Sequence, residues 1–170
     1  SSPAVFNGVV YVGSSDSKVY ALDTATGTKK WEFTTGGSVR SSPAVANAVV
    51  YVGSDDKKVY ALDAATGTKK WEFVTGAEVD SSPAVANGVV YVGSDDKKVY
   101  ALNAVTGAKK WEFATGGAVG SSPAVANGVV YVGSGDYKVY ALDPVTGEKK
   151  REFVTGGEVK SSPAVANGRL

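Results

Sequence analysis

A forty-residue repeat is the feature that most constrains this chain. The pentapeptide SSPAV begins at residues 1, 41, 81, 121 and 161. Units 41–80 and 81–120 differ only at positions 48, 63, 65, 68, 74, 77, 78 and 80, so 32 of their 40 residues are identical. Such units predict an array in which each repeat packs on its neighbours. The units are 1–40, 41–80, 81–120 and 121–160, and residues 161–170 repeat the beginning of a unit.

The near identity of the units bears on their origin. Natural repeats usually drift further apart, so the array is either a recent amplification or an engineered consensus. The chain has no initiator Met, and Arg169-Leu170 stand where earlier units carry Val-Val. We therefore expect an excised or trimmed piece.

Each unit has the pattern of four short strands. In the second unit they are expected at 44–46, 49–52, 59–62 and 70–74, which are short apolar runs bounded by turn residues. Asn47-Ala48 occupies the place of Asn-Gly in the sister units, the strongest signal for a two-residue hairpin. Asp55 to Lys58 form the second turn. In the third, Asp63 is placed to accept hydrogen bonds from the backbone of its own turn.

The unit is thus predicted to be a four-stranded antiparallel meander that tapers from a small inner strand to a bulky outer strand. Ala44, Val45 and Ala46 lie on the inner strand, whereas Trp71 and Phe73 lie on the outer one. This taper suits wedges arranged around an axis. We therefore predict an all-β fold, a β-propeller with four blades in the chain.

Composition excludes several classes of function. Lys and Arg total 18 against 17 for Asp and Glu, so no strong field attracts nucleic acid or an anionic membrane. No apolar stretch approaches the roughly 18 residues of a membrane helix, so membrane insertion is not expected either. Cys, His and Met are absent, which removes thiolate chemistry, the commonest general base and the commonest transition-metal ligand.

One motif returns in every unit. Residues 21–31, ALDTATGTKKW, resemble the tryptophan-docking motif of pyrroloquinoline-quinone (PQQ) type propeller repeats, and the resemblance covers essentially the whole chain. In that family each tryptophan stacks between the alanine of its own repeat and a glycine peptide of the next. The resemblance implies docking roles for Ala21, Gly27, Trp31, Ala61, Gly67, Trp71, Ala101, Gly107, Trp111 and Gly147, with Arg151 replacing the fourth tryptophan.

The resemblance does not imply the quinone. Family members that oxidise alcohols hold PQQ and Ca²⁺ with long insertions, and this chain has none of them. We expect no cofactor and no enzyme, and instead a scaffold or protein-interaction module. The alternative is a fragment of a PQQ- and Ca²⁺-dependent dehydrogenase, or a binder of a small ligand at the axial channel. By resemblance, the location is the periplasm or the cell surface.

Three features resemble functional sites, and each has a structural interpretation. Ser41-Ser42 have no His to activate a nucleophile. Asp55-Asp56 fall short of the six or more oxygens of a Ca²⁺ site and are interpreted as a solvated turn. The Lys29-Lys30 pair and its repeats form a periodic basic rim, but a Glu follows two residues later, which favours a solvated edge over a polyanion site.

Differences between units collect in the second turn and in the connection to the next unit, which open on the same face of a propeller. Arg40, Asp80, Gly120 and Lys160 directly precede each SSP and are expected to ring one mouth of the channel. Such variation marks a possible binding face, although exposed loops also tolerate drift.

The four units must also be arranged so that the array of blades closes on itself. PQQ-type propellers usually have eight blades, so we expect a homodimer that completes one ring. Residues 161–170 would then provide an extra inner strand that competes with residues 1–10, and the sequence leaves open which copy is used.

Overall fold

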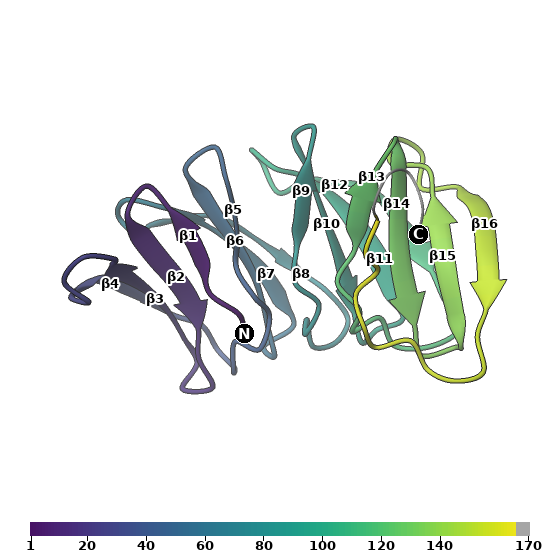
Figure 1. The fold of residues 1–170 in the computed structure, drawn as a ribbon, viewed down its shortest axis with the longest axis horizontal. Helices are drawn as coiled ribbons and strands as arrows, with labels where there is room; N and C mark the ends of the chain where they lie inside the picture. Colours follow the sequence, from purple (N-terminus) through teal and green to yellow (C-terminus); the bar gives the residue numbers. More distant parts are fainter. Residues whose placement is uncertain (166–170) are drawn as a thin grey trace.

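The computed structural model describes residues 1–165 and confirms the all-β prediction. It contains four sheets of four antiparallel strands, and within each sheet the strands follow the order of the chain. The sheets stand side by side as blades, from the N-terminal blade at one end to the C-terminal blade at the other (Figure 1). Over these residues the structure contains no helix long and apolar enough to cross a membrane.

The strand bounds repeat with the sequence. Blade 1 comprises β1 (Ala4–Phe6), β2 (Val9–Gly13), β3 (Lys18–Asp23) and β4 (Lys29–Thr34). Blade 2 comprises β5 (Ala44–Ala46), β6 (Val49–Ser54), β7 (Lys58–Asp63) and β8 (Lys69–Val74). Blade 3 comprises β9 (Ala84–Ala86), β10 (Val89–Ser94), β11 (Lys98–Asn103) and β12 (Lys109–Ala114). Blade 4 comprises β13 (Ala124–Ala126), β14 (Val129–Ser134), β15 (Lys138–Leu142) and β16 (Lys149–Val154).

The first turn of each blade has the backbone that its sequence predicts. Asn7 and Gly8 have φ of 47° and 72°, and both values are positive, as a type I′ hairpin requires. In blade 2 the turn keeps this shape without the glycine, because Asn47 and Ala48 have φ of 50° and 58°. The two-residue loop therefore fixes the register of the first two strands, with Ala46 opposite Val49.

The third turn combines a capped loop with a β-bulge. The Asp63 carboxylate accepts hydrogen bonds from the amides of Ala65 and Thr66, at 3.0 and 3.1 Å. Leu62 pairs with Lys69 and Ala61 pairs with Trp71, so Lys70 is the extra residue of the bulge. Its Nζ lies 3.2 Å from the carboxylate, and this bond, followed by that of the Thr66 amide, lowers the pKa of Asp63.

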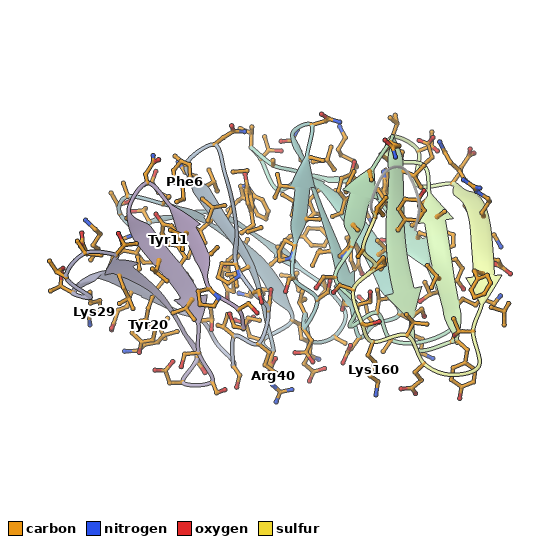
Figure 2. The ribbon with its side chains drawn as sticks, viewed as in Figure 1. Phe6, Tyr11, Tyr20, Lys29, Arg40 and Lys160 are labelled. Atoms are coloured by element: carbon orange, nitrogen blue, oxygen red, sulfur yellow. The ribbon has the colours of Figure 1, made fainter. Side chains whose placement is uncertain are left out.

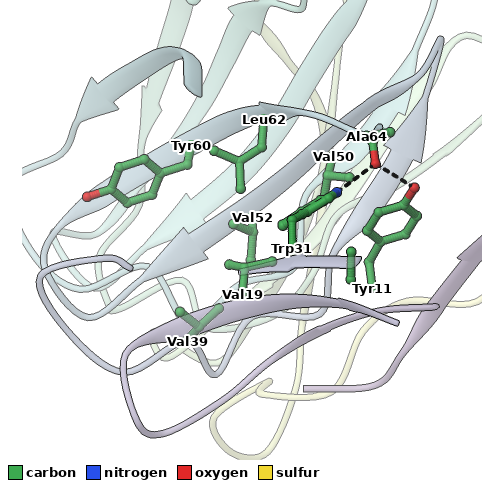
Figure 3. Packing of buried hydrophobic residues seen from close by; sticks show 10 residues of the cluster. Tyr11, Val19, Trp31, Val39, Val50, Val52, Tyr60, Leu62 and Ala64 are labelled. Carbon is green, nitrogen blue, oxygen red and sulfur yellow. Dashed lines mark hydrogen bonds between the residues drawn. The ribbon is translucent and has the colours of Figure 1, made fainter. Parts of the chain in front are cut away.

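The core lies between blades rather than within them. We call the apolar interface between two neighbouring blades a seam. The first seam is formed by side chains of blade 1, which are Tyr11, Val19, Ala21, Trp31 and Val39, and by side chains of blade 2, which are Val50, Val52, Tyr60, Leu62 and Ala64 (Figure 3). Equivalent residues form the seams between blades 2 and 3 and between blades 3 and 4. Each blade is therefore stabilised by its neighbours, as in other repeat proteins.

The C-terminal segment continues past blade 4. Residues 161–165 are described and are not part of a strand, and the remainder of the extra inner strand expected at 161–170 lies outside the described residues. Ser161 and Ser162 contact the beginning of blade 4, through Ser121 and Ser122.

Candidate functional site

The tryptophan of each blade is locked onto the next blade by its polar edge. Trp31 is 8% exposed and stands opposite Ala21. Its Nε1 donates to the Ala64 carbonyl at 2.9 Å, and the Tyr11 hydroxyl donates to the same oxygen at 3.0 Å (Figure 3). Ala64 thus receives two donors from the preceding blade, and its carbonyl is satisfied where it is buried.

A glycine of the next blade makes room for the indole. A Cβ atom on Gly67 would lie 2.7 Å from Cδ2 and from Cε3 of Trp31, and the backbone there has φ of +74°. Both the close approach and the left-handed backbone require glycine. Gly107 and Gly147 meet Trp71 and Trp111 in the same way. Among the described atoms nothing lies within 4 Å of the corresponding position on Gly27, which is on the free face of blade 1.

A second link joins each blade to the preceding one, at the turn between its second and third strands. The Asp56 carboxylate accepts from the Gly36 amide of the preceding blade at 2.7 Å and from the Tyr60 hydroxyl at 2.5 Å. Asp96 and Asp136 form the same pair of bonds in blades 3 and 4. Burial, and after it the bond to Asp56, raises the pKa of the Tyr60 hydroxyl. Asp56 is therefore a structural residue of the seam.

This arrangement corrects the prediction of a solvated turn at Asp55-Asp56. The Asp55 side chain is only 18% exposed, because the connection that leaves blade 1 folds over the turn and the Ser38 carbonyl accepts from the Asp55 amide at 2.9 Å. Among the described residues, no cluster of three or more Asp or Glu side chains is arranged to hold a metal ion.

Replacing Asp96 by Ala is expected to destabilise the fold by about 1–3 kcal/mol, because the Gly76 amide and the Tyr100 hydroxyl lose their acceptor. Asp16→Ala is the matched control. In the single chain Asp16 accepts from Tyr20 of its own blade and caps its own turn at Lys18, without a link to a preceding blade. Urea denaturation of dilute single chains measures both, and an equal loss for the two variants would contradict the role of Asp96 in the seam.

Along the outer strands the lysines of these pairs lie in ion pairs, with the exception of Lys110 among the described residues, because Asn103 replaces the aspartate there. Lys29 and Lys18 both reach Glu32 at 2.7 Å, and Lys30 lies 3.3 Å from Asp23. Equivalent Lys–Glu pairs recur in all four blades. The outer edge is therefore charge-compensated, which disfavours a polyanion-binding rim.

In the second, third and fourth copies of SSP the first serine is buried, whereas Ser1 and Ser161 are exposed. Ser41 Oγ accepts from the Gly53 amide at 3.0 Å, and the Ser41 side chain has no solvent exposure. Ser81 and Ser121 hold Gly93 and Gly133 in the same way. These hydroxyls fasten the beginning of the inner strand to the second strand of their own blade.

The residues before each SSP gather at one edge of the row of blades. Arg40 and Lys160 project from this edge (Figure 2). At this edge, residues of blades 2, 3 and 4 line an open pocket of about 540 Å³, and its lining includes Asp80, Gly120 and Lys160 together with Asp95, Gly135 and Glu158. The four positions predicted for the mouth thus share one edge, and we call these residues and the pocket the mouth.

Opposite charges pair at the mouth, between blades 1 and 2 and within blade 4. Arg40 lies 3.5 Å from Asp55 and 3.8 Å from Asp80 of the next blade, and Lys160 lies 2.8 Å from Glu158. Burial, and after it the charges of Asp80 and neighbouring Glu78, raises the pKa of Asp95. The mouth therefore carries both acidic and basic side chains, and its charge is not of a single sign.

The two ends of the row expose complementary halves of a seam. On blade 1 the free half consists of Val10, Val12, Tyr20 and Leu22, all partly exposed, whereas their counterparts in blades 2 and 3 are buried. On blade 4 the free half consists of Tyr131, Val139, Arg151, Phe153 and Val159. Phe153 is 65% exposed, whereas Phe33 packs edge-on against Tyr60 with ring centroids 5.3 Å apart.

Sequence reasoning missed two parts of the seam. Tyr11 is buried and lies 5.7 Å from Trp31 between ring centroids, but its bond to Ala64 was not anticipated. The tyrosine in the YVG that recurs in every unit is a signal that was available. The acceptor is the backbone carbonyl of Ala64, and every residue type has such a carbonyl. The sequence therefore does not predict which residue provides it.

The four sheets and their seams define the class of this protein as a β-propeller built from tandem blades. The family model for the outer membrane protein assembly factor BamB matches residues 1–81 and 74–169. The chain therefore belongs to this family of PQQ-like propeller repeats. Comparison with curated proteins found no match.

Solved structures share the fold. The computationally designed protein Ika8 matches with a TM-score of 0.87 at 20% identity, over 97% of this chain and 52% of that one. BamB from Moraxella catarrhalis matches with a TM-score of 0.85 at 19% identity, over 98% and 55%. A quinohemoprotein alcohol dehydrogenase from Pseudomonas putida HK5 gives 0.81 at 23%, over 92% and 34%. This chain spans about half the length of the first two.

Proposed function

We propose that the chain is a non-catalytic scaffold that docks on a second copy to complete an eight-bladed ring and that binds a protein partner at the mouth. The main observation in favour of the ring is that the two end faces of the chain are complementary. Each is one half of a seam that the chain forms three times internally, so the blade 4 face of one copy fits the blade 1 face of the other. In a ring of two copies this contact occurs twice, and no half-seam stays exposed.

The comparisons support the number of blades. The chain corresponds to 52% of Ika8 and 55% of BamB, which is the share expected of half a ring. BamB is described as an outer membrane protein assembly factor. That description supports a role in binding other proteins and a location outside the cytoplasm.

Internal contacts of the chemically capable side chains support a non-catalytic role. Ser41 is held by the Gly53 amide, Asp56 by two donors, and Lys29 by Glu32. The mouth is the surface where the units differ, and its charged groups are partly exposed. A protein segment of mixed charge fits this pattern better than a uniform polyanion does.

Light scattering tests the ring. We expect a mass of twice 17.4 kDa at micromolar concentration. A stable monomer would contradict the proposed ring. The non-catalytic role is tested separately, by incubation with PQQ and Ca²⁺: a bound-quinone absorbance spectrum with dye-linked alcohol oxidation would contradict it.

A further inference from the structure

The beginning of a fifth unit already occupies a defined position beside blade 4. Ser121 Oγ donates to the Ser161 carbonyl at 2.9 Å, and the Ser122 amide donates to Ser162 Oγ at 3.2 Å. At the preceding seam Ser81 Oγ donates to the Ser121 carbonyl at 3.0 Å, and the Ser82 amide donates to Ser122 Oγ at 2.9 Å. Ser161-Ser162 therefore stand where the inner strand of a following blade begins.

Blade 1 fills the same position with its own residues. Ser1 Oγ accepts from the Gly13 amide at 3.1 Å, as Ser41 Oγ accepts from Gly53 in blade 2. If blade 1 of a second copy docks on blade 4 in the geometry of the internal seams, its Ser1 falls on Ser161 of the first copy. One position then has two candidate occupants with the same sequence, SSPAV.

The contacts on the two sides favour the C-terminal occupant. Two residues before Ser161, the Val159 amide donates to the Ser134 carbonyl at 3.0 Å, and a Cβ atom on Gly133 would lie 2.4 Å from Val159 Cγ1. Ser161 is thus tied to blade 4 on both sides of Lys160.

The N-terminal occupant is held less firmly. Residues 1–3 are exposed, and the side chain of Val5 is 67% exposed, so displacement of residues 1–5 uncovers little apolar surface. The bonds lost are few, from the Gly13 amide to Ser1 Oγ and from the Ser2 amide to Ser42 Oγ at 2.6 Å, besides the pairing of Ala4 and Val5 with β2.

We propose that residues 161–165 of one copy displace residues 1–5 of the second copy and become the inner strand of its blade 1. Ser161 Oγ then accepts from the Gly13 amide of the second copy, and Val165 stands opposite Val10, as Val125 stands opposite Val130 within blade 4. The inference rests on the proposed ring, and it adds that the two copies are joined by exchanged strands.

Disulfide trapping tests the exchange, because the chain has no cysteine of its own. Cα atoms of directly paired antiparallel residues lie about 4.5–5.5 Å apart, within the range that a disulfide spans. In Val10→Cys/Val165→Cys we expect most of the protein to become a covalent dimer on mild oxidation. The matched variant Val5→Cys/Val10→Cys, whose residues are paired within one chain, is expected to form little intramolecular disulfide in the dimer.

Light scattering of both reduced variants separates the two hypotheses. If both are dimers and the disulfide forms between residues 5 and 10 instead, β1 keeps its place and strand exchange is wrong while the ring stands. If the reduced variants and the parent chain are monomers, the ring and the exchange are both wrong. Dimers that also form the bond between residues 10 and 165 support both.

Discussion

Replacing Trp71 by Ala is expected to lower the free energy of unfolding by about 3–5 kcal/mol, the range for a large aromatic removed from a core. The side chain is 8% exposed, it fills the space that Gly107 leaves open, and its Nε1 donates to the Ala104 carbonyl at 3.0 Å. The substitution leaves a cavity in the middle seam and removes one donor from a buried acceptor. Urea denaturation followed by circular dichroism measures the loss.

The matched control is Arg151→Ala, the equivalent position in blade 4, where the side chain is exposed in the single chain. At a dilution where light scattering gives the mass of one chain, this change is expected to alter stability by no more than about 0.5 kcal/mol. A similarly small effect of Trp71→Ala would show that the indole does not hold the seam.

Replacing Arg151 by Trp is expected to lower the dissociation constant of the proposed dimer roughly a hundredfold. The ring has two identical junctions, and each is expected to contribute a factor of about ten, or ~1.4 kcal/mol. At internal seams the indole faces a glycine of the next blade, and the face that would receive the introduced indole on the second copy contains Gly27, whose surroundings are open. A guanidinium can lie over the same peptide, but it buries less apolar surface and keeps its charge toward water. The dissociation constant is measured by dilution, with light scattering or sedimentation as the readout.

Val145→Trp provides the control for added aromatic surface. Val145 is 75% exposed and lies in the third turn of blade 4, away from the free half-seam. We expect it to leave the dissociation constant unchanged. An unchanged constant for Arg151→Trp as well would mean that the junction does not pass through residue 151 and that the closure geometry is wrong.

The sequence predicted those parts of the seam that depend on residue identity. Ala21, Trp31 and Gly67 belong to a recognisable motif because a small residue, a large ring and a glycine are each required at one place. The hairpin at Asn47-Ala48 was predicted because the sister units carry Asn-Gly at this place. Ala48 itself is a poor residue for a positive φ.

The parts that were missed or misjudged depend on how blades meet. The Asp55-Asp56 turn has the composition of a solvated loop, and it becomes half-buried only because the connection from blade 1 folds over it. The contacts of Arg40 with Asp55 and Asp80 likewise arise from residues of a neighbouring blade. Local pattern carries no information about such pairs.

The serine bonds along the inner strands involve other residues than the proposed binding surface at the mouth. Backbone amides of Ser2, Ser42, Ser82 and Ser122 each donate to the serine hydroxyl forty residues further on, which sets the spacing of blades near the axis. The residue directly before each later copy of SSP, which is Arg40, Asp80, Gly120 or Lys160, takes no part in these bonds. In the proposed ring its side chain can therefore be exchanged without a change in diameter, so under that proposal new binding specificities at the mouth would arise by substitution at a few sites while the blades stay in place.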